Sequence, residues 1–132
     1  MSRVHAGREA EPGEIPSMIK VKWFLKRADH LSLDEFHHWW KDTHAPAIVT
    51  VQAPYIKKYL IDLRWSDDPF PGKPRDEMDW DGVAETWYET EDDLRAAYGK
   101  TAISPTRSDT LKHVSRQARM IIRENPIEVG NA

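Results

Sequence analysis

Residues 18–46 join two patterns of different period, and this junction limits the folds that are open to the chain. Residues 18–26 alternate between apolar and mostly basic side chains, which predicts a β-strand with one buried face. Ser32 and Glu35 then begin a helix as a capping box, in which the serine hydroxyl accepts a backbone N–H and the glutamate carboxylate reaches back. Pro46 weakens the helical hydrogen bonding and predicts a bend. The chain therefore starts as a strand that leads directly into a helix.

The rest of the sequence continues this mixed pattern. Alternating side chains predict further strands at 56–65, 82–89 and 114–123. Capping residues predict a short helix at 90–98 and a helix or irregular turn at 104–113. The order β-α-β-β-α-β predicts an α+β, ferredoxin-like fold, in which helices cover one face of an antiparallel sheet.

The second face of such a sheet needs a cover of its own. Two helices cannot cover both faces, and we expect Phe24, Leu60 and Ile121 to lie among charged residues on the uncovered one. Burial of this face against a second copy of the chain would produce a two-fold dimer. The sequence therefore predicts a homodimer.

Length and composition exclude several classes of function. The 132 residues suit one domain, which we place at 18–132 after a flexible arm at 1–17, with a long Pro-rich loop at 66–81. The absence of cysteine excludes disulfides, a thiolate nucleophile and cysteine-bound zinc or iron–sulfur sites. A net charge of -3 predicts no nucleic-acid partner. No apolar stretch is long enough to span a membrane, so we expect a cytoplasmic protein without a membrane partner.

The first predicted helix carries an unusual mixture of imidazole and aromatic side chains. With a period of 3.6 residues, one stripe of this helix collects both imidazoles and apolar side chains, namely Leu33, Phe36, His37, Trp40, His44 and Ala47. Histidine titrates near neutral pH and can exchange a proton there. His44 lies near the expected helix end, where the helix dipole would favour a protonated ring. This stripe therefore lines either a reaction site or a core.

The motifs along the chain resemble those of the EthD-like family. The resemblance covers residues 18–124 and rests on the order and spacing of its motifs, which are Phe24-Leu25-Lys26-Arg27, Leu31 to Phe36, Trp40, Thr43-His44-Ala45-Pro46, Tyr59, Asp81 to Tyr88, and Asp109. It implies a dimeric α+β barrel of ferredoxin-like subunits. It also implies kinship with cofactor-independent isomerases, lyases, cyclases and oxygenases that act on aromatic, polyketide or lactone compounds. In such relatives, a pocket histidine at the position of His44 serves as acid or base.

Three residues are candidates for catalysis. His44 would move a proton, or would instead close the helix by a structural hydrogen bond. Tyr59 would donate a hydrogen bond to a developing oxyanion, or would be an ordinary sheet residue. Glu85 would orient the His44 ring, or would form a structural salt bridge with Arg116 or Arg119.

Four further residues are candidates for substrate binding. His37 would bind substrate or relay a proton, or would be a partly exposed helix residue. Phe24, Trp40 and Trp87 would form an aromatic wall for a flat ligand, or would pack in the core. His37 and His44 are too far apart along a helix to share a metal ion, so we predict no metal site.

These residues lead to three hypotheses of function. The first is a cofactor-free lyase, isomerase or cyclase that acts on a small aromatic, polyketide-like or lactone substrate by acid–base chemistry, or a cofactor-free monooxygenase that uses the same pocket. The second is a non-catalytic binding protein for a hydrophobic metabolite or a partner protein. The third is a haem-handling protein in which His44 is an axial ligand. The sequence contains no Gly-rich phosphate loop, so we expect no nucleotide cofactor.

Overall fold

A four-stranded antiparallel sheet forms the frame of the molecule. The computed structural model describes residues 18–65 and 78–130, so the predicted arm at 1–17 and most of the loop at 66–81 lie outside the described residues. The strands occur in the order β2-β3-β1-β4 across the sheet. They are β1 (Ile19–Arg27), β2 (Ile56–Leu63), β3 (Gly82–Tyr88) and β4 (Val114–Ile122).

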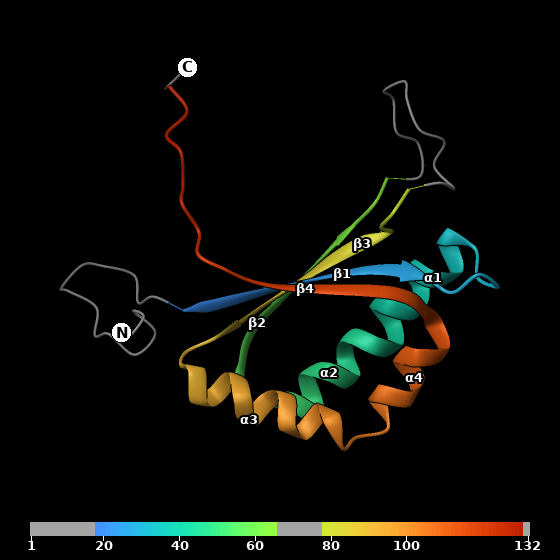
Figure 1. Cartoon of the computed structure of the whole chain (residues 1–132), viewed down its shortest axis with the longest axis horizontal. Helices are drawn as coiled ribbons and strands as arrows, with labels where there is room; N and C mark the ends of the chain where they lie inside the picture. The colour runs from blue at the N-terminus through green and yellow to red at the C-terminus, as the bar shows by residue number, and fades with distance from the viewer. Residues whose placement is uncertain (1–17, 66–77, 131–132) are drawn as a thin grey trace.

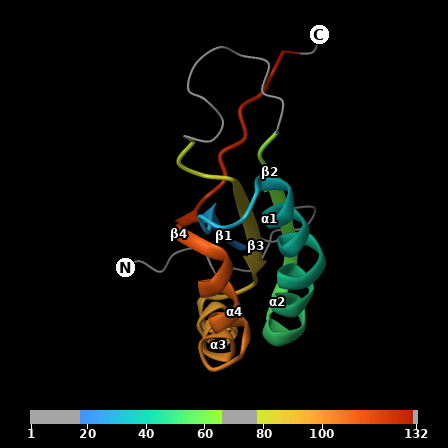
Figure 2. The same ribbon diagram turned by 90° about the vertical axis from the view of Figure 1, so that its right-hand side faces the viewer.

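All the helices lie on one side of this sheet (Figure 1). They are α1 (Leu33–Trp39), the π-helical turn η1 (Trp40–His44), α2 (Ala45–Gln52), α3 (Glu91–Ala102) and α4 (Thr106–His113). The turned view separates them into two columns, α1 with α2 and α3 with α4 (Figure 2). The predicted ferredoxin-like α+β fold is therefore confirmed. None of the helices in the described ranges is long and apolar enough to cross a membrane.

The first helix begins as predicted and continues further than a proline-terminated helix would. Ser32 and Glu35 form the capping box, with a Glu35 backbone N–H donated to the serine hydroxyl at 3.0 Å and a Ser32 N–H donated to the carboxylate at 2.9 Å. Pro46 lies in the first turn of α2, and the helix runs on to Gln52. The π turn directly before the proline joins the two parts, and Ala45 donates its N–H to the carbonyl of Trp40. An extra residue in one turn accommodates the proline without ending the helix.

Alternation assigns each strand residue to one of two faces. We call the helix-covered side the inner face and the other side the outer face. Val21 and Leu25 point to the inner face and belong to its buried core, whereas Phe24 and Leu60 point to the outer face as expected. Ile121 pairs with Val21 across β1 and β4. Our placement of Ile121 on the outer face was therefore wrong, because the β4 register turns it to the inner side.

The element boundaries differ from the predicted ones by a few residues. Strand β2 ends at Leu63 rather than at residue 65, and α3 continues four residues beyond the predicted end at residue 98. Thr90 caps α3 as predicted, since its hydroxyl accepts the N–H of Asp93 at 3.1 Å. The segment at 104–113 is a helix, which begins after Pro105.

Trp40 packs so closely against the start of β3 that only glycine fits beneath it. The indole is fully buried in the core with Phe36. A Cβ atom on Gly82 would lie 2.7 Å from Cζ3 of Trp40 and 3.1 Å from the carbonyl oxygen of Asp62. The absence of a side chain at Gly82 therefore sets the distance between η1 and the sheet.

Candidate functional site

An aromatic cluster joins the first helix to α4 on the inner side of the molecule. Trp39 stacks on the imidazole of His44 with ring centroids 4.7 Å apart, and on the imidazole of His113 at 4.3 Å. His44 and Trp39 are both 8% exposed. The two are five residues apart, a spacing that the π turn brings onto one side of the helix. His113, which follows Asp109 by one helical turn on α4, also belongs to this cluster.

Asp109 holds the cluster in place. Its carboxylate accepts the indole N–H of Trp39 at 2.9 Å and lies 3.5 Å from Nδ1 of His113. The same Nδ1 also contacts the Asp109 carbonyl oxygen at 2.8 Å. Asp109 therefore fixes the orientation of Trp39, and through it the surface on which His44 stacks.

The His44 ring is neutral at physiological pH. Burial is the main cause that lowers its pKa from 6.5 to about 4, and it outweighs the opposing charge of Asp109. The helix continues past His44 to Gln52. The prediction that a helix C-terminus favours a protonated His44 ring is therefore wrong. The hydroxyl of Thr110 lies 3.5 Å from Nδ1 of His44 but donates its proton to the Thr106 carbonyl oxygen at 2.8 Å. The ring is therefore held by its stacking on Trp39 rather than by a strong hydrogen bond, and it stays unprotonated at neutral pH.

Tyr59 lies on the inner face and contacts the same helix. Its hydroxyl accepts the indole N–H of Trp40 at 3.3 Å. Burial raises the pKa of Tyr59 to about 12, so the phenol keeps its proton at neutral pH. Because the oxygen is already an acceptor, this proton is available for donation to another group. Tyr59 has the protonation state that an oxyanion donor needs.

Glu85 is not a partner of His44. It points to the outer face, where its carboxylate forms an ion pair of 2.5 Å with Nζ of Lys20. Hydrogen bonding with Asp62, followed by interaction with Lys20, lowers the pKa of Glu85. The predicted pairing with His44 is wrong because the sheet separates the two, and the alternative pairing with Arg116 or Arg119 is replaced by Lys20.

The predicted aromatic wall is divided between the two faces. Trp40 is buried on the inner side, next to Tyr59. Phe24 lies on the outer face against Trp80, with the two ring centroids 5.8 Å apart. Trp87 also lies there, with the ammonium groups of Lys20 and Lys58 within 4.8 Å of its ring centroid. A single wall of Phe24, Trp40 and Trp87 was therefore a wrong expectation, since only Trp40 lies on the side of His44.

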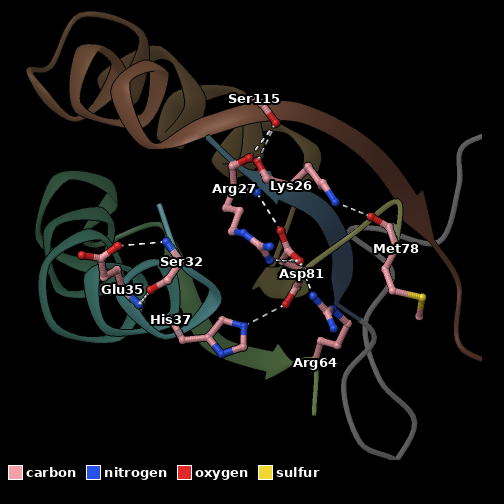
Figure 3. Close-up of polar contacts among 9 residues, drawn as sticks. All are labelled: Lys26, Arg27, Ser32, Glu35, His37, Arg64, Met78, Asp81 and Ser115. Carbon is pink, nitrogen blue, oxygen red and sulfur yellow. Dashed lines mark hydrogen bonds and ion pairs between the residues drawn. The ribbon is translucent and has the colours of Figure 1, made fainter. Parts of the chain in front are cut away.

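His37 ties the first helix to the segment before β3 (Figure 3). Its Nε2 lies 3.0 Å from the carbonyl oxygen of Asp81. The fully buried Asp81 carboxylate accepts hydrogen bonds from the side chains of Arg27 at 3.0 Å and Arg64 at 2.8 Å. Hydrogen bonds and ion pairs from these arginines keep the pKa of Asp81 below its ordinary value although burial opposes this. His37 is thus held in a structural network, which favours positioning over substrate contact through Nε2.

A second inner-face feature was missed because its residues lie on separate elements. The indole N–H of Trp23 on β1 donates to the hydroxyl of Tyr98 on α3 at 2.8 Å. Tyr88 on β3 donates to the side-chain oxygen of Gln52 on α2 at 2.7 Å. Strand alternation places Trp23 and Tyr88 on the inner side, but no spacing in the sequence pairs either with its partner. Among the described residues, no group of three or more His, Asp or Glu side chains is arranged to hold a metal ion.

The fold defines the class of the protein as a ferredoxin-like α+β subunit, and comparison with known proteins agrees. A structure of an ethyl tert-butyl ether D (EthD) family protein from Bacillus halodurans aligns with a TM-score of 0.59 and 18% identity, over 83% of this chain and all of that one. A dimeric ferredoxin-like protein of unknown function from Bacteroides fragilis aligns with a TM-score of 0.53 and 16% identity, over 81% of this chain and 96% of that one. A mutant of SnoaB, a cofactor-independent oxygenase from Streptomyces nogalater, aligns with a TM-score of 0.50 and 19% identity, over 84% of this chain and 97% of that one.

The EthD domain itself matches residues 28–110. The chain therefore belongs to the EthD family. A search among curated proteins finds no match to it.

Proposed function

We propose that this chain is a cofactor-independent enzyme that performs acid–base chemistry on a small aromatic, polyketide-like or lactone substrate. The observation that carries this proposal is the state of His44. The ring is buried, stacked on Trp39 and neutral, and its only contact to a described polar side chain is the long one to Thr110. A neutral, buried imidazole has a free lone pair that can take a proton, and its lowered pKa makes it a weaker base than an exposed imidazole, so it requires an acidic substrate C–H.

The proposed reaction begins with removal of a proton next to a substrate carbonyl group. His44 accepts this proton, and the electrons of the broken C–H bond move to the carbonyl oxygen. Tyr59 donates a hydrogen bond to the resulting enolate oxygen. The enolate then eliminates a leaving group, closes a ring, or takes the proton back at another carbon. A single placed acid–base group contributes about 10²–10⁴-fold, so the substrate must carry an activated C–H bond.

A homodimer is part of the proposal. None of the described helices lies on the outer face (Figure 1). This face carries Phe24 and Leu60, and Leu60 is 43% exposed. The similar proteins from Bacteroides fragilis and Thermobifida fusca are described as dimeric. A second copy packed on this face would cover its apolar side chains.

A cofactor-free oxygenase is a second candidate. SnoaB has a similar fold and is described as a cofactor-independent oxygenase. The enolate formed by His44 could transfer an electron to O₂ instead of eliminating or isomerising. Oxygen consumption measured alongside product formation separates these two reactions.

The test is a mass-spectrometric turnover screen without added cofactor. Hydroxylated aromatics, polyketide-like ketones and lactones would be incubated with the wild type, with His44→Ala and with His38→Ala. His38 is a matched control on the same helix, because its side chain is 80% exposed and pairs with Asp42. We expect a product that the wild type and His38→Ala form equally and that His44→Ala forms at least about a hundredfold more slowly.

The pH profile gives a second check on the role of His44. A base must be neutral in the free enzyme, so kcat/KM should fall as the pH drops through about 4 rather than through 6.5. Equal product from the wild type and His44→Ala would overturn the proposal. Binding of the compounds without any product would favour a non-catalytic binding protein instead.

A further inference from the structure

The segment that follows β4 is an extended arm that leaves the body of the protein. This arm, residues 123–130, is exposed at every position. It leaves the sheet on the side away from the helices (Figures 1 and 2). Near its start, the carboxylate of Glu124 lies 3.0 Å from Nζ of Lys20, and Lys20 belongs to the outer face. The arm therefore begins at the outer face and points away from its own chain.

The arm has the alternating pattern of a β-strand. Ile127 and Val129 fall on one side of an extended chain, and Glu124 and Glu128 fall on the other. The two apolar residues are 82% and 85% exposed. Pro126 has no N–H to donate, which limits such a strand to the edge of a sheet. The pattern indicates an edge strand that has no strand beside it in its own chain.

The exposed surface of the arm continues that of the outer face. Within the described sheet, β4 pairs with β1 only, and its residues 115–121 are all exposed. Met120 pairs with Lys22 and lies on the outer face, where it is 52% exposed. Contiguous exposed apolar side chains mark a surface that binds another protein. Because the proposed homodimer packs a second copy on the outer face, an arm that projects from this face runs along that second copy.

The free edge of β2 has the properties that such an arm requires. In the described sheet, β2 pairs with β3 on one side only, so the backbone groups of its other edge can pair with an added strand. Strand β2 has eight residues, the same length as the arm. Lys57 and Lys58 are exposed on it and are opposite in charge to Glu128. Length, backbone pairing and charge are therefore complementary.

We propose that the arm of each copy adds as an extra strand to the β2 edge of a second copy of this chain. Two-fold symmetry makes the contact reciprocal, so two arms fasten one dimer. Ile127 and Val129 lose their exposure to water in this contact, and Glu128 lies near the two lysines of β2. This inference rests on the homodimer of the proposed function and names the segment that joins its copies.

Sedimentation velocity over a range of protein concentrations tests the contribution of the arm. The double variant Ile127→Asp, Val129→Asp should raise the dissociation constant of the dimer at least about a hundredfold, because two aliphatic side chains would no longer be buried. Ile103→Asp is the matched control, since Ile103 is 88% exposed at the end of α3 on the helix side, and it should keep the wild-type constant. Circular dichroism reports whether each variant is folded.

Disulfide cross-linking tests where the arm binds. The chain contains no cysteine, so each introduced pair reports one contact. Copies with Glu128→Cys would be mixed with copies of a different mass that carry Lys57→Cys or Leu60→Cys, and then mildly oxidised. We expect a covalent dimer of one copy of each kind. Copies with Ile103→Cys are the control and should not cross-link to Glu128→Cys.

Three results would overturn the inference. If the arm variant dimerises as strongly as the wild type, the homodimer stands and the arm has no part in it. If Glu128→Cys copies cross-link to each other and not to β2, the arms pair together instead. A wild type that is monomeric at every concentration would remove the homodimer as well. None of these results bears on the acid–base role of His44, which the turnover screen tests separately.

Discussion

Buried polar groups are paired differently on the inner and outer faces of the sheet. On the inner face, the contacts from Trp40 to Tyr59 and from Trp23 to Tyr98 join neutral groups, although the charged side chains of Asp109 and Arg119 also contact aromatic rings on this side. On the outer face the paired groups are charged, as in the ion pair of Lys20 and Glu85. Neutral groups suit a site that exchanges protons without water. The charged pair is itself little exposed, at 8% for each residue, so its opposite charges must compensate each other for the loss of water.

This difference assigns chemistry to one face and assembly to the other. The two candidates for proton transfer and oxyanion binding that the geometry supports, His44 and Tyr59, both lie on the inner side. On the outer face, Phe24 packs against Trp80, and Trp87 lies beside the ammonium groups of Lys20 and Lys58, so neither aromatic ring faces His44. The predictions below test this separation, from the largest expected effect to the smallest.

The largest effect concerns one phenylalanine from each face. Phe36 is fully buried among Trp39 and Trp40, so Phe36→Ala should lower the free energy of unfolding by about 3–5 kcal/mol. Phe24 is only half-buried, and Phe24→Ala should cost far less in a dilute sample. Urea unfolding at several protein concentrations measures both. The separation fails if the Phe24 variant is the less stable one at every concentration.

Protonation of His44 should destabilise the fold over a defined pH range. Its pKa is lowered from 6.5 to about 4, so the unfolded chain binds the proton first as the pH falls. The stability that the neutral ring provides is complete above pH 6.5 and is lost as the pH falls through about 4, by up to about 3 kcal/mol. Chemical denaturation of the wild type and His44→Gln between pH 7 and 4 should show a shallower decline for the variant. Parallel declines would show that the ring is not buried.

Gly82 tests how tightly the inner face is packed. Gly82→Ala places a Cβ against Trp40 and the Asp62 carbonyl, and overpacking of this kind costs about 1–3 kcal/mol. Gly99→Ala is the control, because its Cβ meets nothing within 4 Å and alanine favours a helix. Thermal unfolding should show a loss for the first variant and no loss for the second. Equal melting temperatures would mean that η1 can move away from the sheet.

Strand alternation and helix capping were sufficient to predict the elements of this fold. The capping box at Ser32 and Glu35 and the alternation in β1 are local patterns, and local chemistry determines them. The β4 register was not predictable in the same way. Strand pairing depends on partners far away in the chain, and a shift of one residue moves Ile121 to the opposite face.

The site was less predictable than the fold for two physical reasons. A period of 3.6 residues cannot reveal a π turn, so the spacing in the sequence aligned His37 with His44 rather than Trp39 with His44. The position of Glu85 was mispredicted for a different reason. Its alternation with Val83 and Trp87 was read correctly, but the sequence does not say which face of the sheet carries the helices. His113 and Tyr98 were missed because their partners lie on other elements.

The smallest effect concerns the ion pair on the outer face. Glu85→Gln removes the charge that pairs with Lys20 at 2.5 Å. Because Lys20 keeps the carboxylate of Glu124 at 3.0 Å and the new amide oxygen can still accept a hydrogen bond, we expect a loss of only about 1 kcal/mol in the free energy of unfolding. The pKa of Glu85 is lowered in the fold, so the contribution of its charge is present above the ordinary carboxylate pKa and is lost as the pH falls below it. Glu89→Gln is the matched control, since Glu89 is exposed and its carboxylate lies 3.7 Å from Nζ of Lys57. Because Glu85 and His44 are on opposite faces, Glu85→Gln should leave the acid limb of the kcat/KM profile unchanged. A shift of that limb would mean that the charge on the outer face acts through the sheet on the proton-transfer site, and the assignment of the two faces to separate tasks would fail.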